Sequence, residues 1–314
     1  MDSTLHGLVE YFKINHKNKI FLTRLMVNGK SFHVLYDYDK KEEIEKFVSN
    51  FTEYLPYYVH PADVLEHLDE ERDLSKQLLV LSKICWNGPI VPTRETKVNG
   101  IFGEVFLDFY ERIVNNAKLA STYASRRDFN SNFENKGFDN VLFSINNNEI
   151  EFVFAESKFV VNKSSARDSL VKDIKGESDS DDAKDSGGHL TKQFLNDYVT
   201  FIVEKNCFFS DDDKRLLKPF FSELNTLLAQ GETDFVSFLI QKNIKINCVF
   251  FAIFKNSNTD PNYYCDCYDA IEEEAKAHLE DIGFTNYNVE IVFIPTKSDS
   301  MKIKGEIDGY YKSN

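Results

Sequence analysis

Alternating apolar and polar residues predict a β-hairpin near the middle of the chain. A β-like run over 138–145 is followed by the polar residues 146–149 and by a second run, 150–155, that is rich in strand formers. Polar residues between two such runs are typical of a turn. Because side chains alternate along a strand, Glu156 and Lys158 should share one face at the end of the second run.

Apolar residues at helical spacing predict a core helix before this hairpin. They occupy positions 102, 105, 106, 109, 110, 113 and 114, which fall on one side of a helix. Glu104 lies near the first turn, where an acid favours the helix dipole. Because the helix leads into the hairpin, Glu104 is also a candidate metal ligand, direct or indirect.

The remaining pattern predicts helices and strands on both sides of this unit in the sequence. Helices are expected at 40–54, 62–85, 189–205, 214–229, 234–241 and 266–282, and strands at 19–27, 31–36, 245–254 and 288–295. The fold class is therefore α/β, with a mixed central sheet flanked by helices and extended by the C-terminal strands. We divide the chain into a smaller N-terminal α+β module, 1–95, and a main domain, 96–314.

The segment 173–188 is acidic, rich in Ser and Gly, and contains no aromatic residue. Such a composition buries too little apolar surface to offset the entropy of ordering, so we expect a flexible surface loop. A calcium loop is disfavoured because the DxDxDG pattern is missing. Since the loop follows the hairpin, it could also act as a DNA mimic that covers the site until DNA or a partner displaces it.

One acid-x-Lys tripeptide stands out by its context. The pattern occurs eight times in the chain, but only the copy at Glu156 closes a clear β-run. Asp139 starts the other arm of the hairpin, so its carboxylate should converge with that of Glu156. Mg²⁺ prefers such oxygen ligands, and a lysine beside the metal can orient water or stabilise negative charge. These groups are the minimal set for metal-assisted phosphodiester hydrolysis.

The same residues carry a resemblance to a known family. Gly103-Glu104, then Gly137-Phe138-Asp139, then Ala155-Glu156-Ser157-Lys158 resemble the PD-(D/E)xK nucleases, which have a restriction-endonuclease-like fold. More narrowly, the chain is similar to the HamA-like nuclease subunit of the Hachiman antiphage defence system, chiefly over 95–205. Phe138 stands where the nominal motif has proline. Relatives also carry a glutamine followed four residues later by a tyrosine, whereas here Gln193 is followed at that distance by Asp197.

The resemblance implies a function and a set of partners. Asp139 and Glu156 would bind the metal, Lys158 would be the catalytic lysine, and Glu104 would match the acid on the preceding helix. The implied cofactor is Mg²⁺, with Mn²⁺ as a substitute. The implied activity is that of a DNA endonuclease, and the implied partners are DNA and a HamB-like helicase subunit.

Net charge argues against DNA binding by the chain alone. The formal charge is −14, whereas DNA-binding domains normally carry a basic surface that releases counterions from the phosphates. A partner that supplies the grip on DNA would account for this charge. A local basic rim is also expected from residues near the two strands, namely Arg126, Arg127, Lys158, Lys163, Arg167 and Lys172.

Two other functions stay open at this point. One is a non-catalytic acidic interaction subunit with a nuclease-like fold, and the other is an RNase or junction resolvase that uses the same site, since the chemistry is on the phosphate. The chain has no long apolar run, no signal peptide and five cysteines without a CxxC pair. We therefore expect a cytoplasmic protein without membrane contact.

Overall fold

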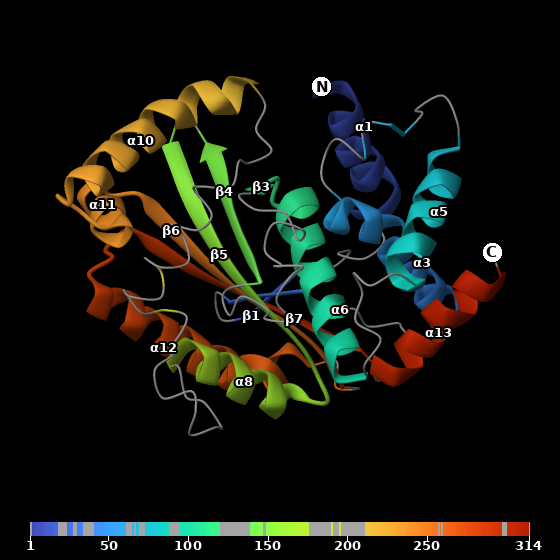
Figure 1. Cartoon of the computed structure of the whole chain (residues 1–314). Coiled ribbons are helices and arrows are strands. Elements are labelled where there is room, and N and C mark those ends of the chain that lie inside the picture. Colours follow the sequence, from blue (N-terminus) through green and yellow to red (C-terminus); the bar gives the residue numbers. More distant parts are fainter. Residues whose placement is uncertain are drawn as a thin grey trace.

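The fold is described from a computed structural model of the chain (Figure 1). The residues that the structure describes are 2–17, 24–27, 30–33, 41–60, 73–87, 95–119, 139–146, 149–175, 211–256, 260–296 and 300–313, with the single residues 65, 67, 68, 190, 195 and 258.

A mixed five-stranded sheet in the order β3-β4-β5-β6-β7 forms the centre of the fold. The strands are β3 (Lys118–Leu119), β4 (Asn140–Asn146), β5 (Glu149–Val160), β6 (Lys245–Lys255) and β7 (Tyr287–Thr296). β4 and β5 form the predicted antiparallel hairpin, in which Asn140 lies opposite Ala155. β6 and β7 continue the sheet parallel to β5. The predicted extension of the hairpin by the C-terminal strands is confirmed.

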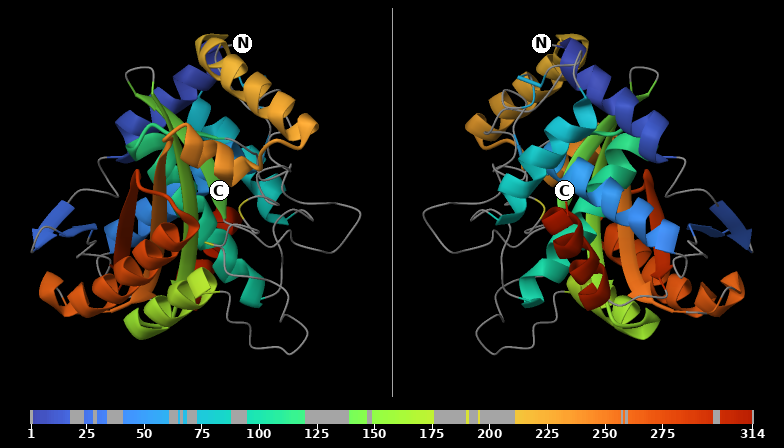
Figure 2. Two further views of the ribbon diagram at one scale, coloured as in Figure 1. Left: turned by 90° about the vertical axis from the view of Figure 1, so that its left-hand side faces the viewer. Right: turned by 90° about the vertical axis from the view of Figure 1, so that its right-hand side faces the viewer.

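Helices cover both faces of this sheet, which confirms the predicted fold class (Figures 1 and 2). On one face α6 packs against β5, and the N-terminal helices and α13 lie behind α6. On the other face α8 packs against β5 and α12, while α10 and α11 cover the opposite end of the strands. The helices on the α6 side are α1 (Asp2–Phe12), η1 (Lys13–Lys17), α3 (Lys41–Val59), α5 (Leu74–Asn87), α6 (Glu95–Phe109), η2 (Tyr110–Val114) and α13 (Ser300–Ser313). The helices on the α8 side are α8 (Lys163–Lys175), α10 (Asp211–Gln230), α11 (Phe235–Gln241), η4 (Pro261–Tyr264) and α12 (Cys265–Ile282).

The two faces of β5 are distinguished by the hydrophobic core that each contacts. Val153, Ala155 and Phe159 belong to the core on the α6 side. Phe152 and Phe154 belong to the core on the α8 side. By the same alternation Ser157 points towards α6, whereas Glu156 and Lys158 point towards α8. The predicted shared face of Glu156 and Lys158 is therefore the α8 face.

The N-terminal part contains the expected hairpin and helices. β1 (Arg24–Val27) pairs antiparallel with β2 (Lys30–His33). Its helices share one hydrophobic core with α6 and the sheet: Phe12 and Phe51, for example, belong to the same cluster as Val249 of β6. The division of the chain at residue 95 stays a prediction.

The predictions for the segment after the hairpin are wrong in part. The first three residues of the predicted acidic loop, 173–175, form the last turn of α8. Only three residues of this helix, Ala166, Leu170 and Ile174, are buried, so its apolar signal was too weak to predict a helix. The rest of the loop lies outside the described residues. So do Gln193 and Asp197 and, apart from Leu190 and Leu195, the helix predicted over 189–205.

None of the described helices combines the length and apolar character needed to cross a membrane.

Candidate functional site

Asp139 lies at the entrance to β4 and is held there by β5. Its Oδ2 accepts hydrogen bonds from the backbone N–H of Ser157 at 2.7 Å and from the Ser157 hydroxyl at 2.6 Å. Two residues later β4 continues with Val141 and Phe143, which pack in the core on the α8 side. Because Asn140 lies opposite Ala155, Asp139 lies beside Glu156 and Ser157 at this end of the sheet, and its carboxylate contacts Ser157. The negative charge of Glu156 acts on Asp139, so the two residues lie near each other, while their role as a pair of metal ligands stays a prediction.

Glu156 and Lys158 form an ion pair at the end of β5. The Lys158 ammonium donates to Glu156 Oε1 over 2.6 Å. The Glu156 side chain is only 4 % exposed, and that of Lys158 is 24 % exposed. A carboxylate this deeply buried needs a charged or strongly donating partner, and Lys158 supplies one.

Asp173 of α8 is a further carboxylate at this site, and sequence reasoning missed it. Its Oδ2 lies 2.6 Å from the Lys158 ammonium, so two acids contact one lysine. Asp173 begins another of the eight acid-x-Lys tripeptides, Asp173-Ile174-Lys175. The sequence did not mark this tripeptide as part of the site, because the helix that carries it, α8, was not predicted.

Glu104 approaches from the opposite side of the sheet. It lies on α6, where its Oε2 accepts a hydrogen bond from the Tyr58 hydroxyl of α3. Its negative charge still acts on Asp139. Glu104 is thus close enough to influence Asp139, but it does not share a face with Glu156 and Lys158. Its role as a ligand stays a prediction.

The electrostatics of the site mark it as short of positive charge. Burial, and then the negative charges of Glu156 and Glu104, hold the pKa of Asp139 well above its usual range, although Lys158 and the bond from Ser157 oppose the shift. Burial alone would lower the pKa of Lys158, but the charges of Glu156, Asp173 and Asp139 outweigh it and raise that pKa. Lys158 is therefore held as an ammonium, while ionisation of Asp139 is disfavoured by burial and by the acids beside it and would be favoured by added positive charge.

A close approach of α6 to β5 fixes Ser157, the residue that binds Asp139. A Cβ atom added at Gly103 would lie 2.8 Å from Ser157 Oγ and 3.3 Å from Ser157 Cβ. Real Cβ atoms essentially never come within 3.0 Å of another heavy atom, so an alanine at this crossing would require a shift of the Ser157 side chain, of β5 or of α6.

We expect Gly103→Ala to push Ser157 away from Asp139. Overpacking of this kind costs about 1–3 kcal/mol of unfolding free energy, which urea denaturation would measure. Gly100→Ala, in the same helix, is the matched control. Among the described residues its new Cβ would meet only Glu104 Oε1, at the ordinary distance of 3.7 Å, so the better helix propensity of alanine should leave the protein as stable or up to about 1 kcal/mol more stable. Equal effects of the two variants would contradict the tight crossing.

The donor set fits a hard divalent cation of low protein coordination. No group of three or more His, Cys, Asp or Glu side chains able to hold a metal occurs among the described residues. Mg²⁺, however, is commonly held by one or two carboxylates, with water and substrate phosphate as its other ligands. Asp139 and Glu156 meet that requirement, and their environment lacks the positive charge that such an ion brings.

The predicted basic rim is mostly neutralised within the described residues. Lys163 contacts both oxygens of Asp266, at 2.9 and 3.2 Å, and its ammonium lies over the ring of Tyr263. Arg167 pairs with the neighbouring Asp168 at 2.7 Å. Arg126 and Arg127 lie outside the described residues. This part of the rim therefore adds little free positive charge near the site.

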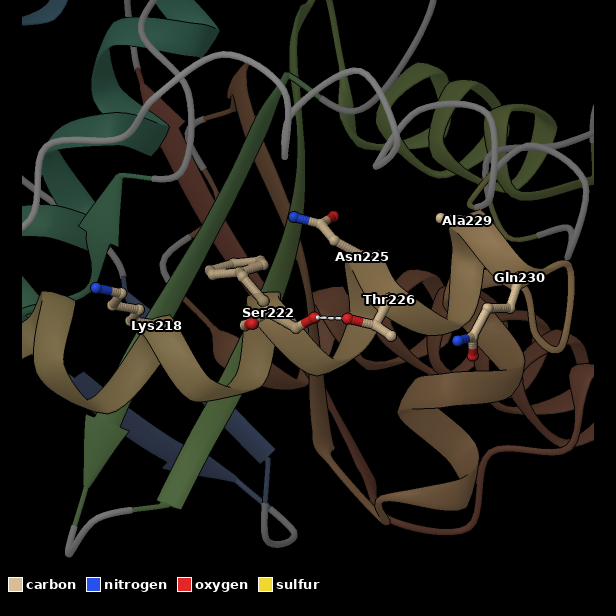
Figure 3. Close-up of a pocket in the computed structure, with 7 residues that line it drawn as sticks. Lys218, Ser222, Asn225, Thr226, Ala229 and Gln230 are labelled. Atoms are coloured by element: carbon tan, nitrogen blue, oxygen red, sulfur yellow. Dashed lines mark hydrogen bonds between the residues drawn. The ribbon is translucent and has the colours of Figure 1, made fainter.

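A separate open depression of about 660 Å³ follows one side of α10. Figure 3 shows Lys218, Ser222, Asn225 and Thr226 along this helix, with the Thr226 hydroxyl donating to the Ser222 carbonyl over 2.8 Å. Among the described residues that line it there is no carboxylate and none of the predicted site residues. The depression is therefore distinct from the carboxylate site.

Comparison with protein families matches the chain to the family described as HamA, over residues 10–302. The match covers both the N-terminal part and the strands that carry Asp139, Glu156 and Lys158. Separate comparisons with curated proteins and with solved structures find no match.

Proposed function

The chain belongs to the HamA family, part of the Hachiman antiphage defence system, and on that basis we propose that it is a metal-dependent nuclease that cleaves phosphodiester bonds together with a helicase partner. One observation carries the proposal. Asp139, Glu156 and Lys158 lie at one end of the β4–β5 hairpin, with the charge of Glu156 acting on Asp139 and the lysine 2.6 Å from Glu156.

Each of these residues has a defined task in this proposal. Asp139 and Glu156 would hold Mg²⁺, which, when bound, offsets charge on the phosphate and makes water more acidic. Lys158 stays protonated among its acidic neighbours, so it donates hydrogen bonds and supplies positive charge rather than acting as a base. The bonds from Ser157 fix the orientation of the Asp139 carboxylate.

A cleavage assay with variants tests this function. The purified chain, with and without a candidate helicase, is incubated with Mg²⁺ and with duplex or single-stranded DNA or RNA. We expect Mg²⁺-dependent cleavage that is lost with a chelator and in Glu156→Gln, which keeps the shape of the side chain but removes its charge. Cleavage by Glu156→Gln at the wild-type rate would contradict the assignment. Use of RNA in place of DNA would change the substrate but not the site.

The charge of the chain gives a further prediction about DNA binding. With a net charge of −14, the isolated protein should bind duplex DNA with a Kd of about 10⁻⁴ M or weaker at physiological salt. The affinity should rise when a basic partner is added, because the partner neutralises phosphates that this chain cannot. Fluorescence anisotropy over a range of salt concentrations would measure both. Tight binding by the isolated chain that does not depend on salt would contradict this prediction.

A further inference from the structure

The function proposed above uses Asp173 only as one of the acids that keep Lys158 protonated. Lys158 lies on β5 and Asp173 lies on α8, and the ammonium is 2.6 Å from Asp173 and 2.6 Å from Glu156. The two carboxylates therefore compete for one positive charge. Glu156 is nearly inaccessible to solvent, whereas the side chain of Asp173 is 27 % exposed.

Stability alone does not account for this arrangement. The Asp173 Oδ2 atom that contacts the ammonium is buried, so the attraction between the two charges must first offset the cost of removing them from water, and such a pair is weak evidence for stability. The position of Asp173 is nevertheless specific, because α8 brings it to the lysine that the cleavage site uses.

Charge sharing at Lys158 has a direct consequence for Glu156. If Glu156 alone received the ammonium, the ammonium would neutralise the carboxylate and compete with a cation for its oxygen atoms. A second acid on the other side of the ammonium draws part of that interaction away. Glu156 then keeps enough negative charge for a cation, and Lys158 stays beside the site.

We propose that Asp173 is a positioning residue, which shares the Lys158 ammonium with Glu156 and so keeps Glu156 available to the divalent cation. The inference rests on the proposed function, because it presupposes that Glu156 binds a metal. It predicts that Asp173 affects metal affinity only through Lys158 and does not bind the metal itself.

The test is a double-mutant cycle on the full chain that measures Mn²⁺ binding by isothermal titration calorimetry. We expect Asp173→Asn to weaken Mn²⁺ binding roughly tenfold, the effect of one charge at contact distance, and Asp173→Glu to restore most of it. In a Lys158→Met background, Asp173→Asn should change the affinity by no more than about twofold. Melting temperatures of the metal-free variants show that each is folded.

Asp168→Asn is the matched control. It is the same substitution in the same helix, but Asp168 is 64 % exposed and pairs with Arg167, so Mn²⁺ binding should not change. Unchanged affinity in Asp173→Asn would overturn the inference alone. Equal weakening with and without Lys158 would show that Asp173 is itself a ligand, and this too would overturn it. If the wild-type chain binds no Mn²⁺, the proposed function fails, and the inference fails with it.

Discussion

Lys158→Ala is expected to lower the rate of phosphodiester cleavage by about 10²–10³, the usual cost of removing one preorganised electrostatic group from an active site. The variant keeps the proposed metal ligands Asp139 and Glu156, so metal binding should persist. The substitution removes the positive charge of Lys158 from beside these two acids. Cleavage rates at saturating Mg²⁺ would measure the loss, and circular dichroism would show that the fold is intact.

Lys276→Ala is the control for this experiment. Lys276 ends another acid-x-Lys tripeptide, which begins at Glu274, but it lies on the exposed side of α12 and pairs with Glu272 at 2.7 Å. Its removal should change neither cleavage nor phage protection. If Lys158→Ala retained wild-type cleavage, the hairpin would be only a structural element and the nuclease proposal should be abandoned.

The second large effect is expected at the polar contacts that hold α6 in place. Arg112 donates to Asp108 Oδ2 over 3.2 Å, and its guanidinium lies 4.0 Å from the centre of the Tyr57 ring. Asp108 is completely buried, and its Oδ2 also accepts from the Tyr54 hydroxyl at 2.7 Å. Arg112→Met leaves this carboxylate buried without its cation. We expect a loss of about 3–5 kcal/mol of unfolding free energy, measured by urea denaturation.

A second substitution checks the reason for that loss. Asp108→Asn in the Arg112→Met background removes the buried charge, so it should recover a large part of the lost stability. Lys76→Met breaks an exposed pair with Asp73 and should change the unfolding free energy by no more than about 1 kcal/mol. If Arg112→Met were as mild as Lys76→Met, the buried pair would not be what anchors α6.

Local patterns predicted much of the sheet and of the site. β4, β5, β6 and β7 follow from apolar runs and turn residues, because a strand in a buried sheet leaves a strong signal in its own sequence. The grouping of Asp139 with Glu156 followed from the hairpin alone, since an antiparallel pair brings the start of one arm to the end of the other.

The parts that the sequence did not reveal depend on contacts between distant segments. α8 has a weak apolar stripe, so neither the helix nor the position of Asp173 was predicted. The bond from Tyr58 to Glu104 joins α3 to α6, and no local pattern indicates which tyrosine meets which acid. The placement of Glu104 behind the sheet depends on how α6 crosses β5, which in turn depends on the missing side chain of Gly103.

The position of β5 between an antiparallel and a parallel neighbour has a consequence for how the chain folds. Its pairing with β4 joins residues close in sequence, but its pairing with β6 joins Glu151 to Lys245, 94 residues later. During synthesis the hairpin therefore emerges well before the strand that completes its other edge. Pairings over such a distance form slowly and late. A nascent chain thus carries Asp139, Glu156 and Lys158 long before it has the sheet that fixes their geometry. The site can therefore reach its final geometry only after β6 has been synthesised and has paired with β5.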